Sequence, residues 1–193
     1  MKTDLVLAGV GGQGILSIAA TIGMAALKND LFIKQSEVHG MSQRGGAVES
    51  HMRVSDKPIA SDLIPKGKAD LILSVEPMES LRHLPFLSPD GWLVTNTSPF
   101  VNIPNYPDLE EVLNQVKTNE KYIALDADDI SAKVGSKRAS NIVMLGAATP
   151  FIDMPFESFE EGIRQIFAAK GDAIIDLNIN ALRAGRKFAL ENM

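Results

Sequence analysis

The segment that most constrains this chain is residues 4–27, where an apolar run, a glycine-rich turn and a second apolar stretch follow one another without a break. The run Leu5–Ala8 is uninterrupted by polar residues and predicts a buried strand, whereas Ile15–Leu27 is long and Ala-rich and predicts a helix. Between them lie three glycines with G-x-G-x-x-G spacing, which joins a strand to a helix in dinucleotide-binding folds. The segment therefore predicts an α/β fold that opens with a strand–turn–helix unit.

Each glycine of this turn has an expected role. Gly9 is expected to allow the tight turn, Gly11 to let an anionic group approach the backbone, and Gly14 to let the helix pack closely on the strand. Together with Gly12 and Gln13 they form a candidate ligand-binding loop, because free N–H groups at the positive end of a helix favour a phosphate or a carboxylate. The same spacing can also serve strand–helix packing alone.

Length, charge and cysteine content narrow the class of protein. The 193 residues fit a single domain, 1–193, and 45% hydrophobic with 22% charged residues is ordinary for a soluble globular protein. A net charge of −5 argues against a nucleic-acid partner. Because cysteine is absent, the chain can hold no disulfide, thiolate-bound iron–sulfur cluster or Cys-based zinc site. No secretory leader or membrane-spanning run is recognisable, so we expect a cytoplasmic protein without a membrane partner.

The rest of the chain keeps an α/β rhythm, which predicts a three-layer Rossmann-like mixed sheet, mostly parallel with an antiparallel edge hairpin. A period of two over 47–54 indicates a half-exposed strand, with residues 59–60 expected to pair back on it. Residues 89–91 are expected to form a turn, and 126–140 a polar loop with room for one helical turn. The other expected strands are 31–35, 69–75, 92–95 and 122–125, and the other expected helices are 76–84, 108–116, 141–148, 156–167 and 172–189.

A second glycine-rich loop is predicted at 36–46, where a dinucleotide-binding fold would normally place a helix. Arg44 before Gly45 and Gly46 offers a bidentate guanidinium beside accessible backbone amides, which suits a phosphate or a carboxylate. Since this loop and the first one each follow a strand, we expect them at the same carboxyl-terminal edge of the sheet. The alternative is a solvated connection between edge strands. The polar candidates on the loop are His39, Ser42 and Gln43.

Several other polar residues are weaker candidates. Glu37 closely follows the second expected strand, where a dinucleotide-binding fold carries the acid that holds a ribose. Glu76 and the group Asp126, Asp128 and Asp129 also follow strands, although capping of the next helix explains such residues more often. Lys137–Arg138 could contact an anion, and His51 and His83 are read as structural or solvated. We assign no catalytic residue and no metal site, since neither a nucleophile–base arrangement nor a paired-histidine motif can be assembled.

Three blocks of the chain resemble the gamma-type subunit of 2-oxoacid:ferredoxin oxidoreductases, the same domain as the beta subunit of indolepyruvate:ferredoxin oxidoreductase. They are GVGGQG at 9–14, EVHGMSQRGGAVESHMRV at 37–54 and KRASNIVMLGA at 137–147. The resemblance covers nearly the whole chain, and the central block is much more specific than the glycine motif.

The resemblance implies a role in a multi-subunit enzyme. Such enzymes oxidatively decarboxylate a 2-oxoacid (pyruvate, 2-oxoglutarate, a branched-chain acid or indolepyruvate) with CoA to an acyl-CoA, and pass electrons to ferredoxin. Thiamine diphosphate and the iron–sulfur clusters are then held by partner subunits. This chain would complete the complex and supply CoA or anion contacts through its two loops. A homodimer of the isolated chain, a stand-alone NAD(P)-binding oxidoreductase and a purely structural subunit stay open. The implied contact residues are Gly9, Gly11, Gly12, Gln13, Gly14, His39, Gly40, Ser42, Gln43, Arg44, Gly45 and Gly46.

Overall fold

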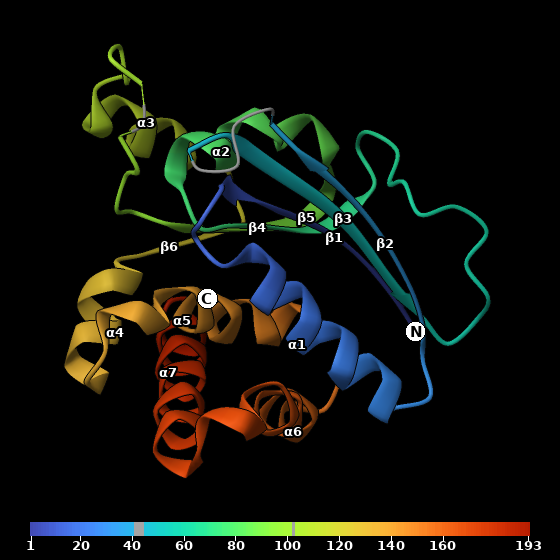
Figure 1. The fold of residues 1–193 in the computed structure, drawn as a ribbon. Helices are drawn as coiled ribbons and strands as arrows, with labels where there is room; N and C mark the ends of the chain where they lie inside the picture. Colours follow the sequence, from blue (N-terminus) through green and yellow to red (C-terminus); the bar gives the residue numbers. More distant parts are fainter. Residues whose placement is uncertain (41–44, 102) are drawn as a thin grey trace.

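In the computed structural model, which describes residues 1–40, 45–101 and 103–193, one mixed sheet lies between two layers of helices (Figure 1). Its strand order is β2-β3-β1-β4-β5-β6. The pairs β1–β4, β4–β5 and β5–β6 are parallel, whereas β3 is antiparallel to both β2 and β1. The predicted mixed sheet with an antiparallel edge hairpin is confirmed. The strands are β1 (Lys2–Val10), β2 (Phe32–His39), β3 (Ala47–Ser55), β4 (Ala69–Ser74), β5 (Leu87–Asn96) and β6 (Tyr122–Leu125).

The helices divide between the two faces of the sheet (Figure 1). Helices α2 and α3 cover one face, and α1, α4, α5, α6 and α7 lie on the other. The larger part of the core is on the second face, where α5 packs on both the sheet and α7. The helices are α1 (Ile15–Lys28), α2 (Pro77–Arg82), α3 (Leu109–Val116), α4 (Ala127–Val134), α5 (Ser140–Ala148), α6 (Phe156–Phe167) and α7 (Asp172–Glu191).

Two glycines let α5 and α7 approach closely. A Cβ atom on Gly146 would lie 2.0 Å from the carbonyl oxygen of Leu182, and one on Gly185 would lie 1.9 Å from that of Val143. The obstructing atoms are backbone, so a side chain at either position would have to push the helices apart. This contact fixes α5, whose amino end reaches the carboxyl-terminal edge of the parallel strands.

The second strand is longer than the sequence predicts. Strand β2 continues to His39, although residues 36–39 are expected in a loop, because β3 pairs with it from Phe32↔Ser55 to His39↔Val48. The predicted pairing of residues 59–60 with β3 is wrong, since β1 and β2 occupy both of its edges. That segment is instead part of a loop, in which the Lys34 side chain donates to the carbonyl oxygen of Ala60 at 3.1 Å. Arg53 and His51 hold the residues that follow it in the loop.

Two further expectations are corrected. Residues 89–91 belong to β5, where Gly91 lets the strand pass its neighbour: a Cβ atom there would lie 2.7 Å from the carbonyl oxygen of Ala69. The polar stretch after β6 contains the full helix α4, with Asp126 as its N-cap and Gly135 in the left-handed conformation at its end. No helix in the described ranges is long and apolar enough to cross a membrane.

Candidate functional site

The two glycine-rich loops meet at the carboxyl-terminal edge of the sheet, as predicted. The N–H group of Gly11 donates to the carbonyl oxygen of Gly46 at 2.8 Å, and that of Gly45 donates to Gly11 at 3.3 Å. Gly40 is tied to Ala47 by a 2.8 Å backbone hydrogen bond, which closes the second loop at its base. The loops therefore form one surface. The predicted contact residues Ser42, Gln43 and Arg44 lie outside the described residues.

The expected division of roles among the glycines is wrong in two places. Gly9 does not make the turn; it lies within β1, and a Cβ atom on it would come within 2.4 Å of Val75 Cγ2. The left-handed conformations that make the turn are at Gly12 (φ 102°) and Gly14 (φ 84°). The close neighbour of Gly14 is Asn141 of α5 rather than a strand, at 2.4 Å from the position of a Cβ atom.

Polar side chains fix the first loop. The amide oxygen of Gln13 accepts from the backbone N–H of Val10 at 2.8 Å, and its nitrogen donates to the carbonyl oxygen of Val75 at 3.3 Å. The side chain of Asn141 donates to the carbonyl oxygen of Gly14 at 3.2 Å. The amino end of α1 has no side-chain cap among the described residues. Its first N–H groups and its positive dipole therefore face this edge.

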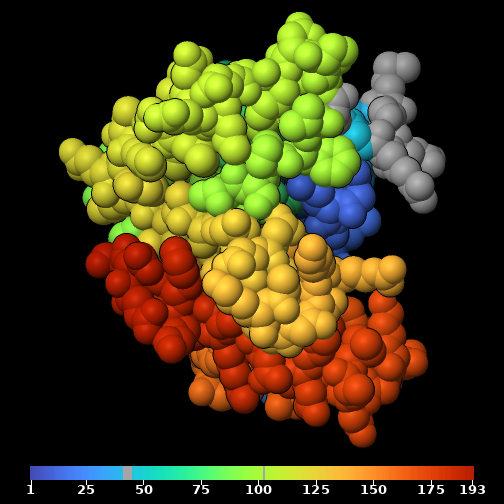
Figure 2. Space-filling view, turned by 90° about the vertical axis from the view of Figure 1, so that its left-hand side faces the viewer, coloured from blue at the N-terminus to red at the C-terminus, as the bar shows by residue number. Residues whose placement is uncertain are grey.

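A cavity of about 200 Å³ lies beside this loop, between the amino ends of α1 and α5. In Figure 2, which faces this edge, the blue N-terminal segment is visible between the yellow-green residues near position 100 and the yellow-to-orange segment after β6. The cavity is smaller than those that enclose whole drug-sized ligands, so it suits part of a larger one. Its lining residues are Gln13, Val75, Asn96, Ser98, Pro99, Phe100, Asp128, Ser140, Asn141 and Met144.

A buried carboxylate holds Phe100, one of the residues that line the cavity. Glu76 is fully buried at the end of β4 and accepts hydrogen bonds from the backbone N–H groups of Glu79 (2.9 Å) and Phe100 (3.3 Å). It also accepts from the Tyr106 hydroxyl, whose pKa is raised chiefly by burial and then by this hydrogen bond. Of the two roles that the sequence leaves open for Glu76, a ligand contact and a helix cap, the structure shows the cap. Glu76 also anchors Phe100 and Tyr106.

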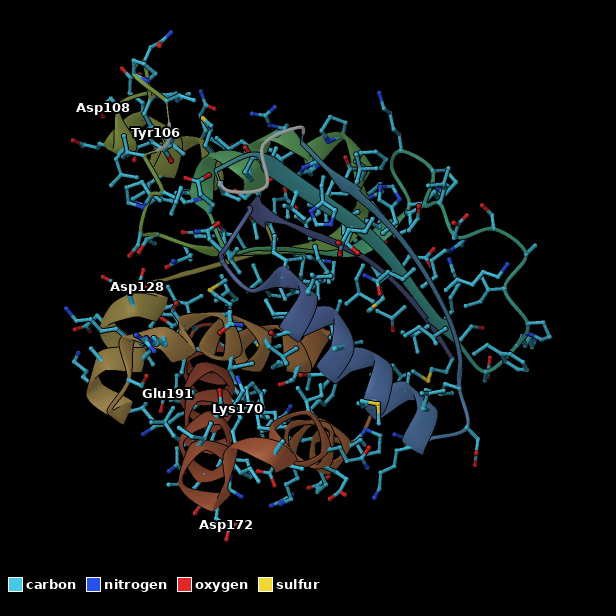
Figure 3. All side chains as sticks on the ribbon, in the orientation of Figure 1. Tyr106, Asp108, Asp128, Lys170, Asp172 and Glu191 are labelled. Carbon is cyan, nitrogen blue, oxygen red and sulfur yellow. The ribbon has the colours of Figure 1, made fainter. Side chains whose placement is uncertain are left out.

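The acidic group after β6 serves mainly α4. Asp126 accepts from the N–H of Asp129 at 2.8 Å, and Asp128 lines the cavity, where Asn96 donates to it at 3.3 Å. Figure 3 shows Asp128 and Tyr106 at the same end of the sheet, on opposite sides of it. Sequence reasoning missed Asn96 and Asn141; their signal was position, since one ends a strand and the other opens a helix.

Two cations directly precede helix α5, whose first residues Ser140 and Asn141 line the cavity. Lys137 and Arg138 are exposed on the 3-10 turn that leads into α5, and the described part of the chain gives neither a carboxylate partner. His39, by contrast, is paired with Glu37 at the end of β2. The edge therefore offers backbone N–H groups, amide side chains and two unpaired cations near one cavity. This combination favours an anionic ligand or partner.

A buried polar cluster of β3 and α2 side chains lies on the sheet face that α2 covers. His51 accepts from the backbone N–H of Ile64 at Nδ1 (2.9 Å), so its Nε2 carries the proton that goes to Glu49 at 2.6 Å. Burial lowers the pKa of His83, and burial raises that of Glu79, whose carboxylate lies 3.9 Å from the His83 ring nitrogen. The structural reading of both histidines fits this burial. Within the described ranges, no group of three or more acidic or histidine side chains could hold a metal ion.

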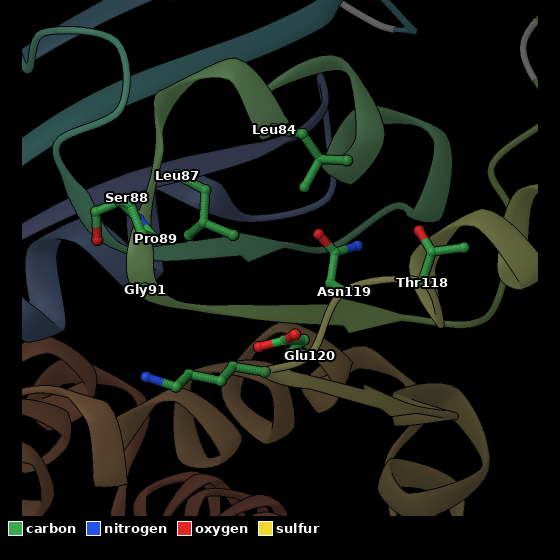
Figure 4. Close-up of a pocket in the computed structure, with 9 residues that line it drawn as sticks. Leu84, Leu87, Ser88, Pro89, Gly91, Thr118, Asn119 and Glu120 are labelled. Atoms are coloured by element: carbon green, nitrogen blue, oxygen red, sulfur yellow. The ribbon is translucent and has the colours of Figure 1, made fainter.

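A second cavity, of about 340 Å³, lies at the opposite edge of the sheet (Figure 4). It is formed around Leu87, Gly91 and Lys121, where β5 and β6 begin. Ligands of open α/β sheets bind outside the carboxyl ends of the strands, at a point where the strand order reverses. The smaller cavity satisfies this geometry, whereas the larger one does not.

The strand order argues against a nicotinamide dinucleotide site. In a dinucleotide-binding fold the acid that holds the ribose ends a strand next to the glycine loop. Here β3 separates β2, which carries Glu37, from β1, and that carboxylate is engaged by Gln35 and His39. The hypothesis of a stand-alone NAD(P)-binding oxidoreductase therefore lacks a carboxylate placed to hold the ribose.

The family model for pyruvate ferredoxin/flavodoxin oxidoreductase matches residues 4–188. The chain belongs to this family. Both glycine loops, Glu76 and the α5 amino end fall within the match, so the site is part of the family domain.

Family members and solved structures extend along nearly the full chain. The indolepyruvate oxidoreductase subunit IorB of Archaeoglobus fulgidus is 37% identical, with 98% of this chain and 96% of that protein covered. The pyruvate oxidoreductase subunit PORC of Thermotoga maritima has a TM-score of 0.73 at 25% identity, with 96% of each chain covered. The 2-oxoglutarate:ferredoxin oxidoreductase of Magnetococcus marinus, solved with 2-oxoglutarate, coenzyme A and succinyl-CoA, has a TM-score of 0.78 at 19% identity. The match covers 98% of this chain and 31% of the Magnetococcus chain, and at this identity it shows the fold alone.

Proposed function

We propose that this chain is a subunit of an indolepyruvate:ferredoxin oxidoreductase, an enzyme that oxidatively decarboxylates a 2-oxoacid with CoA to an acyl-CoA and CO2 and passes the two electrons to ferredoxin. The observation that carries the proposal is the match to an indolepyruvate oxidoreductase subunit over almost the whole length of both chains. The absence of cysteine agrees with iron–sulfur clusters held by other subunits. Thiamine diphosphate would likewise belong to a partner, and the complex would be cytoplasmic.

Within that complex, the joined glycine loops would contact CoA. CoA carries phosphate groups, and three features of the edge suit them: the uncapped amino end of α1, the uncapped amino end of α5 and the cations Lys137 and Arg138. The cavity between the two helices would take one polar portion of the molecule. Arg44 follows from the sequence as the bidentate phosphate ligand.

Substitution of Arg44 separates a ligand-binding role from a structural one. With the partner subunits present, Arg44→Ala should raise the KM for CoA about 10-fold, because one charge-assisted contact is lost, and should leave kcat and assembly intact. Lys133→Ala is the matched control, since Lys133 is an exposed cation on α4 whose partner is Asp129. Loss of assembly in the Arg44 variant would favour a purely structural loop, and an unchanged KM would remove CoA from this edge.

A further inference from the structure

One flank of the molecule leaves a strand edge open. Strand β2 is the terminal strand of the sheet, and β3 is its one partner in the described part of the chain. It is eight residues long, and its side chains are exposed or half-buried throughout. Such an edge presents a row of unpaired N–H and C=O groups, which is a template for pairing with another strand.

Large apolar side chains border this edge on both faces of the sheet. On β2, Phe32 is 48% exposed and Val38 63%, and both lie on the face away from α1. On α1, which runs below β2 in Figure 1, Leu16 and Leu27 are 58% and 59% exposed. The helix side of the flank is next to the strand, since a Cβ atom on Gly23 would lie 3.5 Å from Ile33 of β2.

The pattern on β2 is complementary to itself. When a strand pairs antiparallel with its own copy across a two-fold axis normal to the sheet, residues of the same face meet. With Gln35 on the axis, Phe32 of each copy lies opposite Val38 of the other. Lys34 then lies opposite Ser36, so no like charges face each other. Both exposed apolar pairs are covered at once.

The pattern on α1 has the same symmetry. Leu16 and Leu27 lie on one line along the helix with the small residues Ala20 and Gly23 between them. In an antiparallel pair of α1 helices, Leu16 of one copy would meet Leu27 of the other, and Ala20 would meet Gly23. The midpoint of this line is about 10 Å before the end of α1, and Gln35 is about 10 Å after the start of β2. The same two-fold axis can therefore relate the two copies of β2 and the two copies of α1.

We propose that this flank is the interface between two copies of the chain, in which β2 pairs with β2 to form a continuous twelve-stranded sheet (six strands from each copy) and the α1 helices pack across the same axis. The occupant is a second copy because both elements match themselves about one axis. A different subunit would have no reason to reproduce that match. This interface does not depend on the proposed function.

Sedimentation of the isolated full-length chain tests the interface. The unaltered chain should be a dimer, and Leu27→Lys should raise the dimer dissociation constant about 100-fold, because apolar burial is lost twice in a symmetric interface. Leu190→Lys is the matched control: Leu190 is 53% exposed and, like Leu27, is the penultimate residue of its helix. A monomeric chain, or equal weakening by the two variants, would overturn the proposal.

Cross-linking tests the register in the assembled complex. Because the chain has no cysteine, Gln35→Cys introduces a single thiol on the expected axis, and oxidation or a short bismaleimide should join two copies of this chain. Glu111→Cys, on exposed α3, is the control and should give no cross-link beyond random collision. Cross-links from position 35 to a different subunit, or none above the control, would contradict pairing of β2 with β2.

Discussion

Removal of a single hydroxyl tests the anchor that Glu76 provides for Tyr106 and for Phe100, which lines the cavity. Tyr106→Phe keeps the aromatic ring but deletes the donor to the buried Glu76 carboxylate. A hydrogen bond to a charged group contributes about 2 kcal/mol. The free energy of unfolding should therefore fall by about 2 kcal/mol, which corresponds to a Tm lower by about 6 °C for a chain of this length.

The chain supplies its own control, because it has two tyrosines. The hydroxyl of Tyr122, on β6, has no hydrogen-bond partner in the ranges that the structure describes. Tyr122→Phe should then change the unfolding free energy by less than about 0.5 kcal/mol. Urea unfolding of the two variants side by side measures the difference.

Hydrogen exchange adds a local measurement. The backbone N–H of Phe100 also donates to Glu76, so its protection should fall in the Tyr106→Phe variant, whereas amides of β1 should be unaffected. Equal stability of the Tyr106 and Tyr122 variants, with unchanged protection at Phe100, would refute the conclusion that Glu76 anchors Phe100 and Tyr106. A double-mutant cycle with Glu76→Gln would assign the coupling to this pair.

Three further substitutions test the packing and the buried charge. Gly146→Ala should destabilise the fold by about 3 kcal/mol, because the new methyl group meets backbone atoms of α7. Gly135→Ala is the control: its methyl group enters open space, and the left-handed φ of 109° should cost about 1 kcal/mol. Equal costs in urea unfolding would count against the close α5–α7 contact. For Glu79 the folded-state pKa is raised, chiefly by burial, so its stabilising contribution is full below the unfolded pKa of about 4.3 and is lost as pH rises through the folded pKa. The Glu79→Gln variant should therefore gain stability over the unaltered protein as pH rises from about 4 towards neutrality, and a difference that does not vary with pH would contradict the buried-charge explanation.

The sequence predicts the elements whose signals are local. The first strand, the glycine turn and α1 were recognisable because the apolar runs and the glycine spacing lie within one short segment. The meeting of the two loops was also predictable, since carboxyl ends of parallel strands share an edge. Helix α4 was missed because its residues are mostly polar, although Asp126 and Gly135 carried the start and stop signals.

Local sequence patterns do not predict which strands pair over long sequence separations. Residues 36–39 join β2 because β3 pairs with them, and Val38 alone among the four has a strong strand preference. The insertion of β3 between β2 and β1 is likewise a property of the whole sheet, yet it decides that Glu37 cannot act with the glycine turn. The cavity joins Gln13 to Asn96 and Asn141, which are far apart in the sequence. Only the tertiary structure brings these groups together.

We propose that the chain is an obligatory subunit of a CoA-dependent 2-oxoacid oxidoreductase. The most direct test is reconstitution with the thiamine-binding and iron–sulfur partner, followed by spectrophotometry of ferredoxin reduction with indolepyruvate and CoA. Full CoA-dependent reduction is expected when the chain is present, loss of that activity when it is omitted, and recovery when it is added back. Full CoA-dependent activity of the partner without this chain would contradict the claim.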